Sequence, residues 1–100
     1  LYTGGKSSFI RNNETSGIVI NTGDKNTLMG NTTLGGLISI STDGNLIVHN
    51  CLVYDGAGPS ATATVDLSGA TNDNVVQFNI VDTAVTDAGT NPDIGNNIVV

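Results

Sequence analysis

The residues best able to do chemistry in this chain are its aspartates, its one histidine and its one cysteine. His49 and Cys51 stand two residues apart, and a thiol beside an imidazole is a common form of activated nucleophile. A bend is expected between them at Asn50, and no third group orients the histidine. We therefore interpret His49 as an ordinary strand residue and Cys51 as a small buried hydrophobic residue. One histidine and one cysteine do not form the ligand cluster of a metal site, so neither a metal nor another cofactor is predicted.

Two segments rich in turn-forming residues also contain aspartates. The first, YDGAGPSA, begins at Tyr54, and the second, DTAVTDAGTNPDIG, begins at Asp82. Their glycines, prolines and asparagine predict loops, in which an aspartate commonly serves as a turn residue. A loop carboxylate is also a candidate general acid or base. The candidate aspartates in and near the two segments are Asp55, Asp66, Asp82 and Asp87.

The composition indicates an all-β domain and argues against several classes of partner. Charged residues make up 12% of the 100 residues and hydrophobic residues 38%, which disfavours both long helices and disorder. The net charge is −6, so nucleic acid and anionic membrane surfaces are not expected as partners. No apolar run is long enough to cross a bilayer, so membrane insertion is not expected. Because the sequence starts at LYTGG and stops at NNIVV, we expect it to be part of a longer protein.

A six-residue frame that begins and ends with asparagine recurs along the chain. It reads NTLMGN from Asn26, NLIVHN from Asn45 and NVVQFN from Asn74. A degenerate copy, SSFIRN, starts at Ser7, and a truncated copy, NIVV, starts at Asn97. The frames thus start at positions 7, 26, 45, 74 and 97. The first two steps between them are equal, and the last two are longer.

Short apolar runs accompany each frame and predict a β-solenoid. One run precedes each internal frame and another follows its closing asparagine, so each repeat holds two to three short strands. The position two residues after the start of each frame is apolar in all five copies: Phe9, Leu28, Ile47, Val76 and Val99. We predict a right-handed, single-stranded parallel β-helix of about 4 to 5 coils, with residues 1–100 forming part of one domain. An antiparallel sandwich is the alternative, but it predicts no fixed asparagine frame.

Stacking of the coils explains the asparagines. Equivalent residues of successive coils lie about 4.8 Å apart, so their side-chain amides can hydrogen-bond up the stack. Asparagine also tolerates the left-handed backbone that a sharp bend between strands requires. We therefore expect an asparagine ladder at each of two corners. The first is expected to contain Asn12, Asn31, Asn50 and Asn79, and the second Asn26, Asn45, Asn74 and Asn97.

The two longer steps predict two loops that leave the stack. They belong to neighbouring coils and would flank a shared groove if they left on the same side. Asp82 is the most unusual carboxylate near them, because equivalent positions in other coils hold Leu34 and Val53. The simplest interpretation of Asp82 is that the strand has ended and the aspartate opens a turn.

The segments NLIVHNCLVYDG, VVQFNIVDTAVTD and GNNIVV resemble coils of the pectin-lyase-like right-handed parallel β-helix superfamily. The low charge, short coils and Ser/Thr/Asn-rich stack are most similar to phage tailspikes and tail appendages. The resemblance covers nearly the whole chain but is at the level of the fold, which enzymes and non-enzymes share.

The resemblance implies a homotrimer on a virion tail or a cell surface, with a bacterial surface polysaccharide as its partner. It leaves three functions open: a structural shaft that helps to recognise host glycans, a polysaccharide hydrolase, and an adhesin or filament spacer. A hydrolase would need two carboxylates on either side of a glycosidic bond, and the implied catalytic candidates are Asp55, Asp82 and Asp87. Tyr54 is the candidate for stacking on a sugar, because it adjoins Asp55 at the mouth of a loop.

Overall fold

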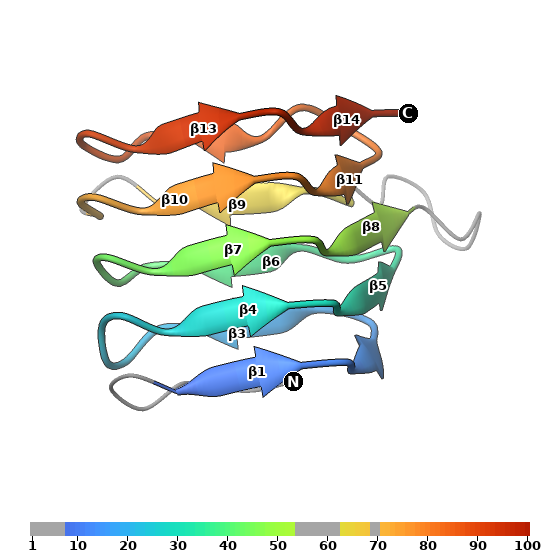
Figure 1. Cartoon of the computed structure of the whole chain (residues 1–100), viewed down its shortest axis with the longest axis horizontal. Coiled ribbons are helices and arrows are strands. Elements are labelled where there is room, and N and C mark those ends of the chain that lie inside the picture. The colour runs from blue at the N-terminus through green and yellow to red at the C-terminus, as the bar shows by residue number, and fades with distance from the viewer. Residues whose placement is uncertain (1–7, 54–62, 69–70) are drawn as a thin grey trace.

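The computed structural model is an all-β parallel solenoid of about four turns, and it describes residues 8–53, 63–68 and 71–100. Within these ranges, fourteen short strands form three parallel sheets that run along the stack (Figure 1). This architecture confirms the all-β solenoid predicted from the asparagine frames. Short strands suit the sequence, because apolar β-branched residues come in brief runs between turn residues.

The strands fall into three sheets, which we call A, B and C. Sheet A contains β1 (Phe9–Arg11), β4 (Thr27–Met29), β7 (Leu46–Val48), β10 (Val75–Gln77) and β13 (Asp93–Gly95). Sheet B contains β2 (Glu14–Thr15), β5 (Thr32–Leu34), β8 (Cys51–Val53), β11 (Ile80–Val81) and β14 (Ile98–Val99). Sheet C contains β3 (Ile18–Ile20), β6 (Ile38–Ile40), β9 (Val65–Leu67) and β12 (Thr86–Asp87).

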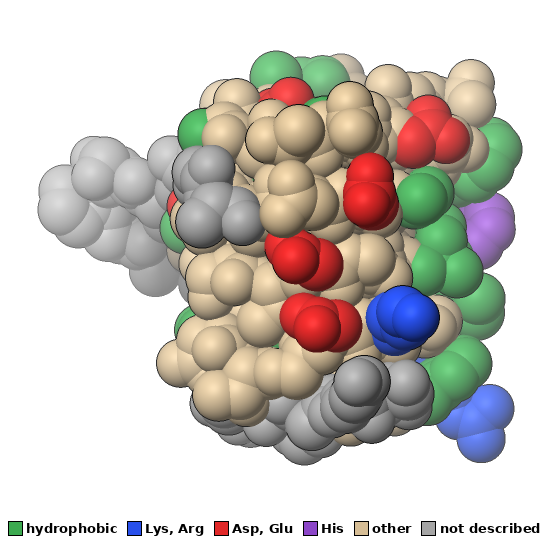
Figure 2. All heavy atoms as spheres, turned by 90° about the vertical axis from the view of Figure 1, so that its left-hand side faces the viewer, with side chains coloured by type: hydrophobic (Ala, Val, Ile, Leu, Met, Phe, Trp, Pro, Cys, Tyr) green, Lys and Arg blue, Asp and Glu red, His purple; other side chains and the backbone are tan. Residues whose placement is uncertain are grey.

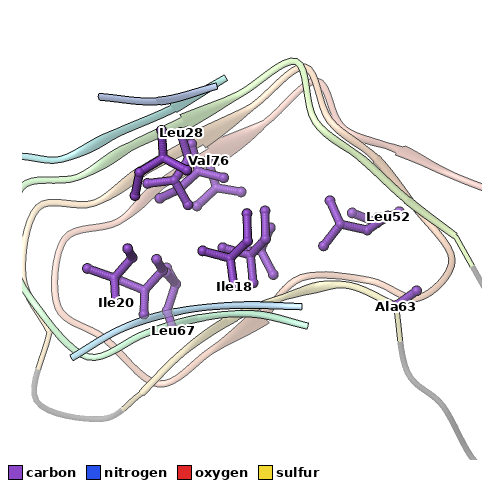
Figure 3. Close-up of a cluster of buried hydrophobic side chains, with 13 residues drawn as sticks. Ile18, Ile20, Leu28, Leu52, Ala63, Leu67 and Val76 are labelled. Carbon is purple, nitrogen blue, oxygen red and sulfur yellow. The ribbon is translucent and has the colours of Figure 1, made fainter. Parts of the chain in front are cut away.

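The core is a set of aliphatic columns between the three sheets (Figure 3). Each strand turns its alternate residues inward, so one column forms for every inward position. Sheet A contributes its central residues, sheet C its first and last, and sheet B its second, as at Leu52. The buried hydrophobic residues are Ile10, Ile18, Ile20, Leu28, Ile38, Ile40, Ile47, Leu52, Ala63, Val65, Leu67, Val76 and Val81.

The observed strand register shows that the frames expected at the two ends of the chain were misplaced. In sheet A the stacked residues are Phe9, Thr27, Leu46, Val75 and Asp93. The first and last steps are therefore shorter than the frames predicted. The predicted frames aligned Phe9 with Leu28, but Phe9 is 55% exposed. Ile10 takes the inward position and pairs with Leu28.

The second predicted loop is also wrong. The segment after Asp82 contains β12 and β13 and forms an ordinary coil, in which equivalent ladder residues are 18 positions apart. The surplus of the long coil lies between Cys51 and Val65 and, to a smaller extent, between Leu67 and Val75. A groove flanked by two neighbouring loops is therefore not formed, because one of those loops is part of the stack.

Two buried asparagine ladders run along the corners on either side of sheet A, as predicted, but two of their members differ. The first ladder contains Asn31, Asn50 and Asn79, and its side-chain amides bond at 3.0 Å. Asn13, rather than Asn12, donates to Asn31 at its lower end. Asn97 accepts from Asn79 at its upper end and so belongs to this ladder. The second ladder contains Asn26, Asn45 and Asn74.

Register explains both changes of membership. Pairing of Ile10 with Leu28 places Asn13 beside Asn31, and pairing of Ile94 with Val76 places Asn97 above Asn79. Residue 92, which follows Asn74 in the second column, is a proline and has no amide side chain to extend that ladder.

The left-handed residue of each bend is the one before the ladder asparagine, not the asparagine itself. Positive φ values occur at Asn12, Gly30, His49, Phe78 and Asn96 along the first corner. Along the second corner they occur at Lys25, Gly44, Asp73 and Asn91. The ladder side chain is thereby free to point into the stack while its neighbour absorbs the bend.

Candidate functional site

Two of the candidate aspartates, Asp66 and Asp87, do not form a catalytic pair. Asp66 is the central residue of β9 and points outward, beside Thr86 of β12. Asp87 pairs with Leu67, so it belongs to the column on the inner side of sheet C that holds Ile20 and Ile40. It lies on β12, the exposed last strand of that sheet. Because alternate residues of a strand face opposite ways, Asp66 and Asp87 lie on opposite faces of sheet C. They cannot together flank a single glycosidic bond.

Asp82 stands where the sequence alignment placed it. Val81 pairs with Leu52, so Asp82 follows in the column that holds Val53 and Leu34 below it. Its backbone N–H donates to the carbonyl of Ala63, which fixes the chain as it leaves sheet B for sheet C. The half-buried side chain of Asp82 therefore lies at a bend, which agrees with its interpretation as a turn residue.

Two further predicted site residues, Tyr54 and Asp55, lie outside the described residues.

Acids of the second corner have structural partners. The carboxylate of Asp24 accepts from the backbone N–H of Asp43 at 3.1 Å, and that of Asp43 accepts from Asn72 at 2.7 Å. Each of these two carboxylates therefore accepts from a backbone N–H of the coil above it. Asp87 likewise accepts from Gly89 in a turn.

His49 and Cys51 are separated by the bend expected from the sequence. β7 ends at Val48, His49 has a φ of 54°, and β8 begins at Cys51. The imidazole stacks on the ring of Phe78, one coil above, with ring centroids 5.6 Å apart and planes 13° apart. Both rings lie on the surface of the first corner, and the half-buried cysteine faces outward from sheet B. Within the described residues, no group of three His, Cys, Asp or Glu side chains is placed to hold a metal ion.

A surface that the sequence did not reveal is the outer side of sheet A, which we call face A. Its three middle strands turn the apolar Met29, Leu46, Val48 and Val75 outward, of which Val48 is largely covered, together with the polar Thr27 and Gln77. Figure 2 shows hydrophobic side chains gathered along one edge of the molecule, next to a face with several acidic groups. Face A was missed because the alignment did not separate the inward from the outward apolar residues of each frame. The adjacent apolar pairs Leu28-Met29 and Ile47-Val48 were the signal, because neighbouring strand residues face opposite sides.

No helix in the part of the chain that the structure describes is able to span a membrane. Comparisons with protein-family models, with curated proteins and with solved structures find no match. The candidate site therefore rests on the geometry of the solenoid itself.

Proposed function

We propose that this chain is a structural segment of a β-helical shaft of the phage tailspike or tail-appendage kind, and that it contributes to recognition of host-surface glycans. Its setting would be a virion tail or a cell surface. The likeness of its coils to those of the pectin-lyase-like β-helix superfamily motivates the proposal. In this role the chain carries load and displays surface, and it does not catalyse a reaction.

The observation that supports a structural role most strongly is the double linkage between coils. Neighbouring coils are joined by parallel backbone pairing in all three sheets and by two ladders of buried side-chain amides. A ladder amide such as that of Asn50 is 2% exposed and satisfied on both its donor and acceptor sides. Buried, fully satisfied polar networks rigidify a fold and specify a unique arrangement.

The described carboxylates favour this role over hydrolysis. Asp24, Asp43 and Asp87 accept hydrogen bonds from backbone amides of turns, and Asp66 and Asp87 face opposite ways. Glycan contacts are proposed for the exposed Asp87 and the half-buried Asp82, together with Tyr54 and Asp55 of the residues outside the described ranges.

The proposal is tested on a panel of immobilised bacterial capsular and O-antigen polysaccharides. Binding is read by surface plasmon resonance, and cleavage is read by release of reducing ends. We expect binding to at least one polysaccharide without release of reducing ends. Asp82→Asn should weaken that binding, whereas Val19→Ser, on the outer side of β3, should leave it unchanged.

Two results would contradict the proposal, each in favour of a different function. Release of reducing ends that Asp82→Asn or Asp87→Asn abolishes, in a protein that melts normally, would establish a polysaccharide hydrolase. Absence of binding across the panel would favour an inert spacer of the adhesin or filament kind.

A further inference from the structure

The charged residues of face A and its border are arranged by height along the stack. Arg11 lies on β1, at the lower end of face A, and Asp93 lies on β13, at the upper end. Lys25 and Asp73 occupy the same column of the second corner. Lys25 lies one coil below the middle coil, and Asp73 lies one coil above it. All four side chains are exposed. The outward positions of β4, β7 and β10, between the two ends, have no charge.

This arrangement is self-complementary under one symmetry operation. A two-fold axis that runs along the strand direction at the height of β7 brings the first coil opposite the fifth and the second opposite the fourth. Lys25 then faces Asp73 of a second copy, and Arg11 comes opposite Gly95, two residues from Asp93. In the centre Leu46 meets Leu46. Each off-axis contact occurs twice, as in any isologous interface.

We propose that face A is a self-association surface, on which a second copy of this chain packs with its coil stack running in the opposite direction. Opposite charges pair on either side of the axis, and the aliphatic side chains of Leu46 and Val48 meet their own copies at the axis. This proposal does not depend on the proposed function.

The upper end of face A has room for the arginine of the partner. A Cβ built on Gly95 would meet no atom within 4 Å, so the surface beside Asp93 is open. In the isolated chain the guanidinium of Arg11 lies 5.4 Å from the centre of the Phe9 ring. Phe9 is more than half exposed, so the side chains of Arg11 and Phe9 can both contact the open surface around Gly95 of the second copy.

A parallel arrangement would lose this pairing of charges. In face-to-face packing of parallel stacks the two-fold axis runs along the stack and reverses the strand direction. Lys25 and Asp73 would then lie opposite the first corner of the second copy, at Gly30 and Phe78, and neither would meet an opposite charge.

Sedimentation equilibrium of the 100-residue chain tests the proposal. We expect a dimer, with Leu46→Lys raising its dissociation constant about a hundredfold because two lysines then meet at the axis. The matched control is Val19→Lys on the outer side of sheet C. Val19 is 42% exposed and Leu46 is 37% exposed, so the control adds the same charge at a similar exposure and should leave the mass unchanged.

A charge exchange tests the direction of packing. Arg11→Asp and Asp93→Arg should each weaken the dimer about tenfold, because two ion pairs become like-charge pairs. The double variant should restore the original dissociation constant, with circular dichroism confirming that every variant is folded. The proposal is overturned by a trimer, by a monomer at about 1 mM, by a Leu46→Lys variant that still dimerises normally, or by failure of the double variant to recover.

Discussion

A single ladder asparagine connects three coils. The Oδ1 atom of Asn50 accepts from both the backbone and the side chain of Asn31 in the coil below. Its Nδ2 group donates to the carbonyl of Leu28 below and to Oδ1 of Asn79 above. The exposed Asn12, by contrast, stands next to a ladder and takes up the bend with a φ of 55°. Adjacent asparagines thus have different tasks, one in side-chain hydrogen bonding and one in backbone conformation.

We predict that Asn50→Ala lowers the free energy of unfolding by about 3–5 kcal/mol, because it leaves several buried donors and acceptors without partners at about 1–3 kcal/mol each. The measurement is equilibrium denaturation in urea. Asn12→Gly is the matched control and should change stability by less than about 0.5 kcal/mol, since glycine accepts a positive φ readily. Equal losses in the two variants would show that the ladder is not a main source of stability.

At the scale of strands and bends, the spacing between coils is set by close backbone contacts. A Cβ at Gly36, in the bend between β5 and β6, would overlap the carbonyl oxygen of Ser16 in the coil below. A Cβ at Gly95, at the end of β13, would enter open space. The two glycines therefore have different structural importance, although both lie at or next to a strand end.

We predict that Gly36→Ala destabilises the fold by at least about 2 kcal/mol, because neighbouring coils must separate to admit the methyl group. Gly95→Ala should stay within about 0.5 kcal/mol of the parent chain. Thermal melting followed by circular dichroism compares them. A Gly36→Ala variant with an unchanged melting temperature would mean that the bends adjust freely and do not set the spacing.

The same scale shows how much of the fold could be predicted from the sequence. In the three middle coils, a single asparagine at each corner made the alignment unambiguous, and Asn31, Asn50, Asn79, Asn26, Asn45 and Asn74 were assigned correctly. The first coil contains the adjacent asparagines Asn12 and Asn13, between which a frame counted in asparagines cannot choose. In the last coil the opening position of the frame is Pro92, so Asn97, which closes that frame, was taken to open a new one.

The inward alternation of the strands makes the choice in the folded chain. Ile10 and Ile94 occupy the columns of Leu28 and Val76, and the asparagines follow from that register. The exposed position of Phe9 on face A was missed for the same reason, because one residue of register decides whether Phe9 or Ile10 faces solvent.

On the scale of the whole molecule, the stack is close to one-dimensional. Each strand pairs only with its equivalents in the coils directly above and below, so stability is expected to be a sum over coils and the contacts between them. Removing a whole coil should therefore shorten the stack while leaving the remaining contacts intact.

We predict that deletion of residues 27–45 yields a folded chain. The deletion spans one complete step of the stack, from Thr27 to Leu46, so Leu46 then stacks on Phe9 and Asn50 on Asn13. Deletion of residues 27–36 removes a shorter segment but breaks a coil, and we expect that chain not to fold. Far-ultraviolet circular dichroism and urea denaturation distinguish the two. If the shorter deletion were the better tolerated, the coil would not be the unit of stability.

The orientation of the hydrogen bonds has a mechanical consequence. β1 and β14 belong to the first and last coils of the stack (Figure 1), and the bonds between coils run along the line that joins these ends. Tension applied at β1 and β14 would act along those bonds and would break them one coil at a time. A shearing force would instead load many of the bonds at once. The molecule would then lengthen by releasing one coil at a time, each ordinary coil yielding roughly 60 Å of extended chain. A stack that is stiff towards sideways bending is thus extensible along its own axis.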